Sequence, residues 1–556
     1  MKGVNTRPRG FTSQLGGGGV RRRRERRSRR PSARAWAERP TASRRNAGIF
    51  VVRAHFLRRV VDLAVGASSS GQEDTKMTTE TATVSAAEVV ATTRRRDGLI
   101  ALVREALAGT RHDFTKLPVR RAILLLAIPM VAEMLMESLF SLADIFWVSK
   151  LGAAATATVV LTESMLIIVY SFAMGLSMGG AAIVARRIGE KDPSGAAGAT
   201  VQAIALGLAL AVIVGLVGAF AGHHLLRAMG ASPEVVALGG RFARVMLGGS
   251  ITVILLFMIN AAFRGAGDPA IAMRTLWLAN GINMVLGPVL VFGLGPIPAL
   301  GVSGAAIATT IGRGIGVIYQ IRALRAGRGH LAIRREHLRI DRAVQATILR
   351  LSGTGIFQIL IATTSWVGLT MVVTSFGSLA VAGYGIATRI VMFALMPSFG
   401  MANAAATLVG QNLGAGQPER AEQAVWRASF YNLLFLGTVG LLFVVFGEVI
   451  VGAFNQDPVI VGYSTKALRI ISAGFLFYAF GMVVTQSFNG AGDTRTPTLI
   501  NFFCFWLLEI PVAWLLSKPL GLGPTGVFIS VLVGFSTMAI VASLLFRRGR
   551  WKRAAV

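Results

Sequence analysis

Three carboxylic acids lie inside the first long apolar stretch of this 556-residue chain, at a depth where a charge is costly. Glu137 and Asp144 follow Glu133 by four and eleven residues, which places the three at about 0°, 40° and 20° around a helix. They share this face with Pro129, which we interpret as a hinge. Clustered carboxylates in a poorly hydrated cavity can hold a proton near neutral pH. The spacing therefore predicts an ion-coupling site, with hydrogen bonding to neighbouring helices as the alternative role.

Other polar side chains inside apolar stretches are candidates for lining a cavity of this kind. Glu163 lies near the start of the second stretch, where an interfacial position is equally open. In the second half, Glu509 is the only acid well inside a stretch, and Arg389 is deep enough to reach a cavity or a backbone carbonyl. Amides between packed helices are as common as amides at ligands, and both roles are open for Asn260, Asn280, Asn283 and Gln358.

The elements that hold these residues are long apolar runs. The chain is 53% hydrophobic and only 15% charged, with a mean hydropathy of +0.61, a composition that argues against an ordinary water-soluble enzyme. From residue 122 onward, twelve runs are long enough to cross the ~30 Å hydrocarbon core of a bilayer as helices. They cover residues 122–148, 157–184, 198–220, 240–262, 271–294, 301–323, 353–375, 379–408, 426–450, 464–488, 498–517 and 524–546.

The two halves of this region repeat one another. The segment Phe-Arg-Gly-Ala-Gly-Asp at 263–268 matches Phe-Asn-Gly-Ala-Gly-Asp at 488–493, 225 residues later. Each half holds six runs, so both halves have the same orientation and are related by an axis along the membrane normal. The predicted fold class is an all-α membrane protein of twelve transmembrane helices in two parallel-repeat six-helix lobes, with a substrate cavity between them. Three glycine pairs share the same offset: Gly152 with Gly377, Gly175 with Gly400, and Gly189 with Gly414.

The net charge of +31 is unevenly distributed, and its distribution predicts the topology. Lys and Arg gather in the link between the sixth and seventh runs and in the C-terminal tail, whereas the opposite loops are nearly bare. By the positive-inside rule, both termini and the link are cytoplasmic. The predicted organisation is a disordered leader over 1–96, an amphipathic surface segment over 97–121, an N-lobe over 122–324, a basic linker over 325–344, a C-lobe over 345–546 and a basic tail over 547–556.

The N-terminal leader holds much of the positive charge. Residues 1–76 contain 19 Lys and Arg against 5 acids, a net charge of +14, in a segment too polar to fold by itself. Three interpretations are open: an Arg-rich organelle targeting peptide, a basic arm for anionic lipid or nucleic acid, or a segment without function upstream of a natural start at Met77. No motif of a nucleic-acid-binding module is present, so we expect no nucleic-acid partner.

Missing motifs exclude several kinds of chemistry. No phosphate-binding Gly-x-x-x-x-Gly-Lys motif occurs, so a pump with its own nucleotide domain is excluded, and transport would use an ion gradient or be passive. The single cysteine, Cys504, excludes an intrachain disulfide, and no cluster of Cys and His predicts a metal site. We therefore expect no cofactor, no metal and no enzymatic activity.

Several motifs resemble those of the multidrug and toxic compound extrusion (MATE) transporters, over about residues 113–546. The most specific is Val-Gly-Gln-Asn-Leu-Gly-Ala-Gly-Gln-Pro-Glu-Arg-Ala at 409–421, and the next is Phe-Asn-Gly-Ala-Gly-Asp-Thr-Arg-Thr-Pro at 488–497. The first span matches through Asp-Phe-Thr at 113–115, Ala-Ile-Pro at 127–129 and Leu-Ala-Asp-Ile-Phe-Trp-Val-Ser-Lys-Leu-Gly at 142–152.

The resemblance implies a V-shaped pair of six-helix lobes that exports organic, often cationic compounds by antiport against protons or sodium. Asp144 falls at the N-lobe ion-coupling aspartate of the family, and Asn283 falls at a polar partner. Where the family has a second aspartate, this chain has Gly287, and Glu133 and Glu137 are the candidates to replace it. Sodium-driven members carry acids in the seventh and tenth spans, which lack them here. The chain therefore resembles the DinF-like branch, with proton coupling expected and sodium at Asp144 as the alternative.

The expected partners are small organic molecules and the lipid bilayer, and a monomer suffices because one chain contains both halves. The expected location is the bacterial inner membrane, or an organelle membrane if the leader is a targeting peptide. An alternative function is a lipid-linked precursor flippase of the related superfamily. Such flippases usually have cavities rich in cations and often extra spans, and this chain has twelve runs and few cations inside them.

Overall fold

The computed structural model describes residues 98–554, apart from residue 110 and two side chains. The chain divides into two units, Met1–Thr92 and Thr93–Val556, and only the second contains described residues. The predicted leader, residues 1–96, and the predicted natural start at Met77 lie outside the described residues. Every described helix therefore belongs to the second unit.

Two bundles of helices make up the described part. The first, the N-lobe, contains α3 (Val119–Ser149), α4 (Ala153–Gly189), α5 (Pro193–Ala228), α6 (Pro233–Gly248), α7 (Ser250–Ala266), α8 (Pro269–Phe292) and α9 (Val302–Arg325). A linker with the short helix η1 (Arg335–Leu338) leads to the second bundle, the C-lobe. Its elements are α10 (Arg342–Thr374), α11 (Ser378–Gly414), α12 (Pro418–Gly452), α13 (Pro458–Ala473), α14 (Phe475–Ala491), α15 (Arg495–Asn501), η2 (Phe502–Glu509), α16 (Ile510–Ser517), α17 (Pro524–Arg547) and η3 (Arg550–Arg553).

The number of spans agrees with the sequence. Among the described residues, eleven helices are long and apolar enough to cross a membrane, and twelve if one bent pair counts as a span. That pair is α13 and α14, which meet at 55°, whereas α6 and α7 pass as one continuous span. The predicted all-α fold of twelve spans is confirmed. The helices extend beyond the apolar runs because their polar end turns are helical too: α4 covers Ala153–Gly189 where the apolar run covers 157–184.

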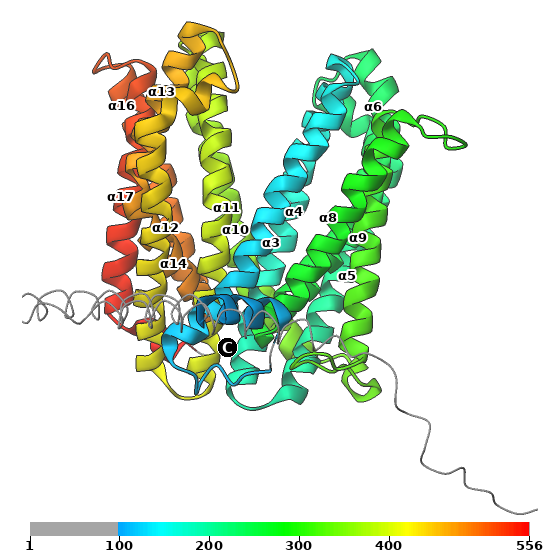
Figure 1. Ribbon diagram of the computed structural model, residues 1–556, viewed down its shortest axis with the longest axis vertical. Helices are drawn as coiled ribbons and strands as arrows, with labels where there is room; N and C mark the ends of the chain where they lie inside the picture. The colour runs from blue at the N-terminus through cyan, green and yellow to red at the C-terminus, as the bar shows by residue number, and fades with distance from the viewer. Residues whose placement is uncertain (1–97, 110, 555–556) are drawn as a thin grey trace, which may run out of the picture. The chain divides into compact units, whose positions relative to one another are not determined.

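The two lobes meet along α3, α4, α10 and α11, at the centre of Figure 1. α4 packs along α10, and α11 packs along both α3 and α4. The lobes are in contact at the end that holds the linker and η3, and they diverge toward the opposite end (Figure 1). We call these two ends the linker end and the open end.

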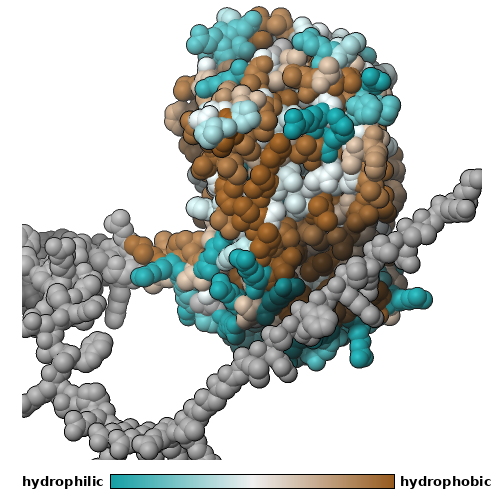
Figure 2. Space-filling view, turned by 90° about the vertical axis from the view of Figure 1, so that its right-hand side faces the viewer, coloured by the Kyte–Doolittle hydropathy of each residue, from teal (hydrophilic) through white to brown (hydrophobic). Residues whose placement is uncertain are grey.

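The outer surface of the N-lobe is apolar over its middle and more hydrophilic toward both ends (Figure 2). In water, an exposed apolar patch of this size would be a liability, whereas in a bilayer it contacts acyl chains. The surface therefore fits a bundle that crosses a membrane. On α5 the exposed apolar side chains are Leu208, Val212, Ile213, Leu216, Val217 and Phe220.

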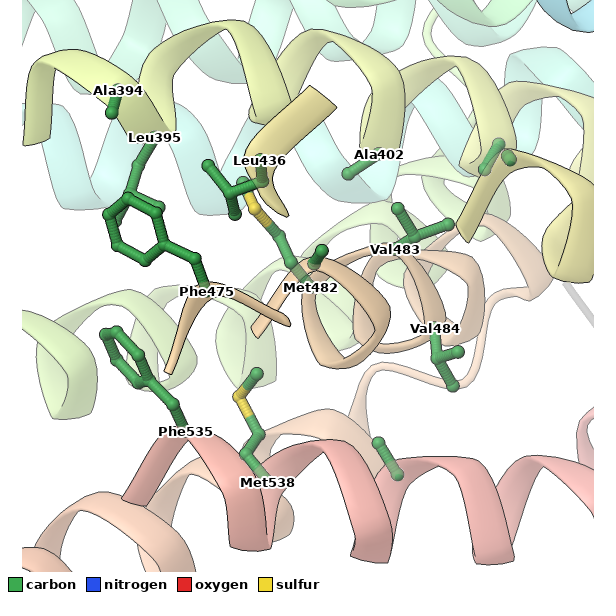
Figure 3. Close-up of a cluster of buried hydrophobic side chains, with 14 of the residues drawn as sticks. Ala394, Leu395, Ala402, Leu436, Phe475, Met482, Val483, Val484, Phe535 and Met538 are labelled. Carbon is green, nitrogen blue, oxygen red and sulfur yellow. The ribbon is translucent and has the colours of Figure 1, made fainter. Parts of the chain in front are cut away.

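The interior of the C-lobe is filled by large apolar side chains (Figure 3). Phe475 and Met482 of α14 lie between Leu395 of α11 on one side and Phe535 and Met538 of α17 on the other (Figure 3). Truncating a buried side chain of this size costs about 2–5 kcal/mol. α14 is thus fixed between α11 and α17, and its position determines where the polar groups on all three helices lie.

Glycines at repeat-related positions bring the two lobes into backbone contact at the linker end. A Cβ added at Gly189 of α4 would lie 2.0 Å from the carbonyl oxygen of Gln411, and one at Gly414 of α11 would lie 2.2 Å from that of Arg186. Gln411 and Arg186 are themselves related by the offset of 225 residues. The contact is therefore reciprocal, and only glycine fits on either side.

The repeated Gly-Ala-Gly-Asp turns form the second part of this contact. Gly267 ends α7 with a φ of +88°, a left-handed conformation that favours glycine, and its repeat counterpart has a φ of +89°. Across the lobes, Gln411 Nε2 donates a hydrogen bond to the carbonyl of Gly265 at 2.9 Å, and Arg186 donates to the carbonyl of Ala491 at 3.4 Å. Each turn is therefore bound by a helix of the opposite lobe.

The linker folds back onto the N-lobe. Leu331 is fully buried in the N-lobe core, and Gln202 of α5 donates to the carbonyl of Arg339 at 2.8 Å. A ring nitrogen of His330 lies 2.8 Å from Asp268 Oδ1, and the backbone N–H of His330 donates to Oδ2 at 2.6 Å. Burial lowers the pKa of His330, but the hydrogen bond and charge of Asp268 outweigh burial and raise that pKa above its ordinary value.

We expect Gly189→Ala to destabilise the linker end, because the new Cβ would overlap the carbonyl of Gln411. Overpacking of this kind costs about 1–3 kcal/mol, so the midpoint of thermal unfolding in detergent should fall. Gly198→Ala on α5 is the matched control: nothing lies within 4 Å of its added Cβ, and its midpoint should stay unchanged or rise slightly. Equal midpoints for the two variants would contradict the close approach of the lobes.

The His330–Asp268 pair predicts that the linker is held more weakly at high pH. Because the folded pKa of His330 is raised, its stabilisation is complete below the unfolded pKa of ~6.5 and is lost as the pH rises through the folded value. Trypsin cleavage after the exposed Arg334 and Arg335 should therefore accelerate over that range, relative to cleavage of a linker peptide. Asp268→Asn should remove most of this acceleration, and a profile that it leaves unchanged would speak against the pair.

Candidate functional site

The three acids of α3 face the interior of the N-lobe. α3 packs against α8, and polar side chains from α7, α8 and α9 contact Glu133 and Glu137. Glu133 is buried, whereas Glu137 and Asp144 are half-buried. The face that the spacing predicts is therefore directed at other polar groups of the lobe.

Glu133 is held by an ion pair with Arg264, near the end of α7. Arg264 Nη1 lies 3.0 Å from Glu133 Oε1, and only 1% of the glutamate side chain is exposed. Asn260 donates to the same oxygen at 3.3 Å and accepts a hydrogen bond from Gln320 of α9 at 2.5 Å. Removing one partner of such a pair leaves a buried charge without compensation. Arg264 is thus the cation that Glu133 contacts at this depth.

Glu137 lies one turn further along α3 and is held more loosely. Asn280 of α8 donates to its Oε2 at 3.0 Å, and Arg313 Nη2 of α9 lies 4.0 Å from its Oε1. The Glu137 side chain is 35% exposed, in contrast with that of Glu133. Glu137 is therefore the more accessible of these two glutamates.

Arg313 of α9 is the cation that two of the acids share. Its side chain is 8% exposed, its Nη1 donates to the hydroxyl of Tyr170 at 3.3 Å, and its guanidinium carbon lies 5.8 Å from the ring centroid of Phe140. Its charge acts on Asp144, the acid nearest the open end. Arg313 is thus fixed by aromatic groups beside two carboxylates that are not themselves in close ion pairs.

Asn283, which the family resemblance makes a polar partner, forms its hydrogen bond within the N-lobe interior. Its amide donates to Thr309 Oγ1 of α9 at 2.6 Å. A Cβ added at Gly287 would stand 3.8 Å from Asn283 Oδ1 and 3.9 Å from Trp147 Cδ1, so a methyl group would fit there without overlap. This chain has no carboxylate at that position, and the described acids that face Arg313 come from α3.

Glu163 of α4 and Arg389 of α11 interact through charge across the two lobes. Both side chains are exposed, and the helices that carry them pack together. The charges of Asp144 and Arg389 both act on Glu163. Two predicted residues of the N-lobe and one of the C-lobe are therefore close enough to interact through charge.

The C-lobe carries amides where the N-lobe carries its buried ion pair. The offset of 225 residues relates Glu133 to Gln358 and Arg264 to Asn489. Both amides are buried, and Asn489 donates to Gln486 at 2.6 Å. The same place in the repeat thus holds opposite charges in one lobe and neutral polar groups in the other.

Pro129 lies within α3, which continues through it as one helix. A Cβ added at Gly400 of α11 would lie 2.7 Å from the backbone nitrogen of Val131, so the C-lobe packs directly on the turn after the proline. The role of Pro129 as a hinge stays a prediction.

At the open end, a concavity of about 620 Å³ lies against α3 and α4, lined by Ser149, Gly152, Thr156, Ala157, Val160 and Leu161.

Sequence reasoning missed Arg264 and Arg313. A signal for Arg313 was available, since it lies in the middle of the apolar run 301–323, and an intramembrane charge needs a partner. For Arg264 the signal is the one mismatch in the repeated turn, where the second copy has Asn489. In the described part of the chain, no group of three or more His, Cys, Asp or Glu side chains could hold a metal ion.

The fold and the polar groups within it define a membrane transporter built from two helical repeats. The MatE family model matches residues 129–289 and 355–515, one segment in each half of the chain. The chain belongs to the MatE, or multidrug and toxic compound extrusion, family, whose members are transporters and not enzymes.

Relatives of the chain are named for multidrug resistance, multidrug export or transport. It is 25% identical over 447 residues to the probable multidrug resistance protein NorM of Thermotoga maritima, a match that covers 79% of this chain and 94% of the relative. It is 24% identical over 438 residues to the multidrug export protein MepA of Staphylococcus aureus, covering 78% and 95%. It is also 25% identical over 405 residues to a FAD transporter of Shewanella oneidensis, covering 72% and 89%.

Solved structures share the fold. A MATE transporter in complex with MaL6 superimposes with a TM-score of 0.75 at 29% identity, covering 79% of this chain and 99% of that chain. An outward-facing multidrug resistance MATE transporter gives 0.75 at 29% identity, with 79% and 98% covered. A transporter of the MOP superfamily from Pyrococcus furiosus, described as having a binding pocket of reversed polarity, gives 0.74 at 28%, with 79% and 98% covered. The predicted two-lobe fold is confirmed.

Arg264→Asn should destabilise the N-lobe strongly, because it leaves Glu133 buried without a cation, at a cost of about 3–5 kcal/mol. The double variant Glu133→Gln/Arg264→Asn copies the amides that the C-lobe has at Gln358 and Asn489, and should recover most of the loss. Thermal unfolding of the purified protein in detergent measures both effects. A double variant as unstable as the single one would show that the unpaired charge of Glu133 is not the cause of the instability.

Proposed function

We propose that the protein is a multidrug efflux antiporter of a bacterial inner membrane, which exports organic, often cationic compounds in exchange for protons. Membership of the MatE family supports a function in transport, and two relatives are named for multidrug resistance or export. The substrate would bind between the lobes, which diverge at the open end (Figure 1). A single chain would suffice, because each of the two repeats forms one lobe.

The observation that carries the proposal is a pair of partly accessible carboxylates beside one buried arginine. Glu137 and Asp144 are half-buried, and Arg313 is within 4.0 Å of the first and acts on the second through its charge. Arginine keeps its charge at any physiological pH, whereas a carboxylate can take up a proton. The net charge of this cluster therefore changes only by the binding of protons or of another cation.

The geometry suggests how proton binding and substrate release exclude one another. With Glu137 and Asp144 ionised, the cluster attracts both Arg313 and a cationic substrate. Protonation removes that attraction, frees α3 from α9 and allows α3 to bend at Pro129. The N-lobe interior then contracts and releases the substrate at the open end, and loss of the protons on the opposite side resets the site. Glu133 stays paired with Arg264 and anchors α3 throughout.

We infer that the linker end lies in the cytoplasm, together with the C-terminus. The linker there exposes Arg334, Arg335 and Arg339, and positive charge next to a span favours the cytoplasmic side. The open end then faces outward, as in the outward-facing MATE structure that superimposes on this chain. The substrate site would be accessible from outside in this conformation.

The alternative function of a lipid-linked precursor flippase needs buried cations that are free to bind a pyrophosphate. Arg313 is buried and Arg264 is half-buried, but Arg264 is in an ion pair and Arg313 lies beside two carboxylates. Arg389 acts on the carboxylate of Glu163. A cavity whose arginines already have acidic partners favours the exchange of cations over the binding of an anion.

A proteoliposome assay tests coupling directly. An imposed pH gradient should drive uptake of a cationic dye, and Asp144→Asn should reduce that uptake about tenfold or more, because it removes a group that links proton and substrate binding. Glu448→Gln is the matched control, since Glu448 is an exposed acid on α12, and it should transport like the unmodified protein.

The same vesicles distinguish the coupling ion and the alternative function. A sodium gradient imposed at equal pH should drive no uptake if protons are the coupling ion. Uptake driven by sodium alone would make sodium, bound at Asp144, the coupling ion. Unchanged transport in Asp144→Asn would contradict the mechanism, and preferential binding of a lipid pyrophosphate over cationic dyes would favour a flippase.

A further inference from the structure

One acid of the C-lobe takes no part in the proposed coupling by the acids of α3. Glu509 ends the segment η2, in the middle of the span that runs from Arg495 to Ser517, and its side chain is 3% exposed. It is buried as deeply as Glu133 of the N-lobe, but its surroundings are different. Glu133 has Arg264 at 3.0 Å, whereas no Lys, Arg or His of the described residues forms an ion pair with Glu509.

The groups that surround Glu509 are all uncharged in their ordinary state. On α17, a Cβ added at Gly534 would lie 3.1 Å from its carboxyl carbon, so the helix backbone packs against the acid. The titratable groups within its electrostatic range are Tyr384 on α11, Tyr478 on α14 and Cys504 on its own segment. Among these three groups there is no positive charge that could balance a carboxylate.

The hydrogen bonds around Glu509 indicate which form of the carboxyl group fits. Ser365 Oγ of α10 lies 3.1 Å from the carbonyl oxygen of Phe505 and 3.3 Å from Glu509 Oε2. A serine hydroxyl has one hydrogen to donate. If that hydrogen goes to the nearer carbonyl, the contact with Oε2 requires a hydrogen on the carboxyl group. A protonated Glu509 satisfies both contacts, whereas an ionised one leaves a buried charge almost without partners.

A second buried polar group lies nearby without a partner. The hydroxyl of Tyr384 is buried and has no hydrogen-bond partner in the described part of the chain, and the residue is 2% exposed. Its ring lies 6.0 Å from that of Phe528 in a stacked arrangement. Glu509 therefore lies in an aromatic, apolar interior, with hydroxyl groups as its polar neighbours. α14, which carries Tyr478, is fixed there by the packing that Figure 3 shows.

The backbone at Glu509 has an unusual form. Residues Phe502–Glu509 are a π-helix between the α-helices α15 and α16, and π-turns are frequent at functional sites. Converting such a turn to α-helix shifts the hydrogen-bond register by one residue and rotates the following side chains by about 100°. The equivalent span of the N-lobe, α8, is a single α-helix without an acid. The C-lobe thus has a π-helix at its buried carboxyl group, whereas α8 of the N-lobe has neither.

We propose that Glu509 is a second proton-binding site of this transporter, in the C-lobe and separate from the acids of α3. The carboxyl group holds its proton in the conformation of Figure 1, with the lobes apart at the open end. When the lobes rearrange, the π-turn changes register, water reaches the carboxyl group, and the proton leaves to that water. The contribution of Glu509 to coupling rests on the proposed proton antiport, whereas the binding of the proton itself does not.

Infrared difference spectroscopy of the purified full-length protein tests proton binding without any transport. At neutral pH the unmodified protein should show a carbonyl stretching band of a protonated carboxylic acid, and Glu509→Gln should lose that band. Glu448→Gln, which removes an exposed acid from the same lobe, and Asp144→Asn should both keep it. An identical band in Glu509→Gln would overturn the proposal. So would a band that sodium abolishes at constant pH, because the site would then bind sodium.

A second variant keeps the test valid if Glu509→Gln does not fold. Ser365→Ala removes the hydroxyl contact and leaves the carboxyl group in place, so the band should shift to higher frequency and not disappear. No shift would contradict the assignment of the band to Glu509.

Transport stoichiometry tests the coupling role. In proteoliposomes, the pH gradient that just balances an opposing substrate gradient gives the number of protons exchanged for each substrate. Glu509→Gln should lower this number by one, and Glu448→Gln should not change it. An unchanged ratio in Glu509→Gln would overturn the coupling role. If the unmodified protein shows no proton-driven transport at all, the proposed function fails, and the infrared result still decides whether Glu509 binds a proton.

Discussion

A carboxyl group inside a helical bundle must either have a cation beside it or carry a proton, because neither apolar side chains nor lipid can replace the water it has lost. Both solutions occur in this protein: Glu133 has a cation beside it, and Glu509, by the proposal above, carries a proton. Glu133 has Arg264 at 3.0 Å, and the two hold α3 against α7. Glu137 and Asp144 are intermediate cases, since they are half-buried and share Arg313 at longer range. The N-lobe therefore contains one close ion pair, Glu133 with Arg264, and beside it two acids that Arg313 holds more loosely.

The repeat explains why the lobes share a shape, and its mismatches explain why they differ in chemistry. Positions that form the contact between the lobes are matched glycines and matched turns, so the backbone contact is the same from either side. Positions inside the lobes have diverged, as in the replacement of Glu133 and Arg264 by Gln358 and Asn489. The contact between the lobes tolerates little change because it is made by backbone, whereas the interiors are made by side chains that can be exchanged in pairs.

Much of this architecture could be predicted from the sequence, and the reasons are physical. A bilayer imposes a minimum length on every span, so twelve long apolar runs give twelve spans. The helical period places Glu133, Glu137 and Asp144 on one face, and a charged face is directed away from lipid. The sequence marks Arg264 and Arg313 as unusual, but it could not show which acid each arginine contacts, because the two arginines come from helices distant in the chain and local spacing carries no information on such contacts. The π-helical form of Phe502–Glu509 could not be predicted either, because its sequence resembles that of an ordinary apolar α-helix.

The reciprocal contact of Gly189 and Gly414 has a geometric consequence. Residues related by a two-fold axis approach their own counterparts as they approach the axis, and a Cβ added at Gly414 would lie 3.0 Å from the Cα of Gly189. The approximate axis of the molecule therefore passes close to this pair. Such a contact is isologous, the kind that joins two identical subunits in a symmetric dimer. The two repeats of this one chain therefore meet through the kind of interface that otherwise joins two identical subunits.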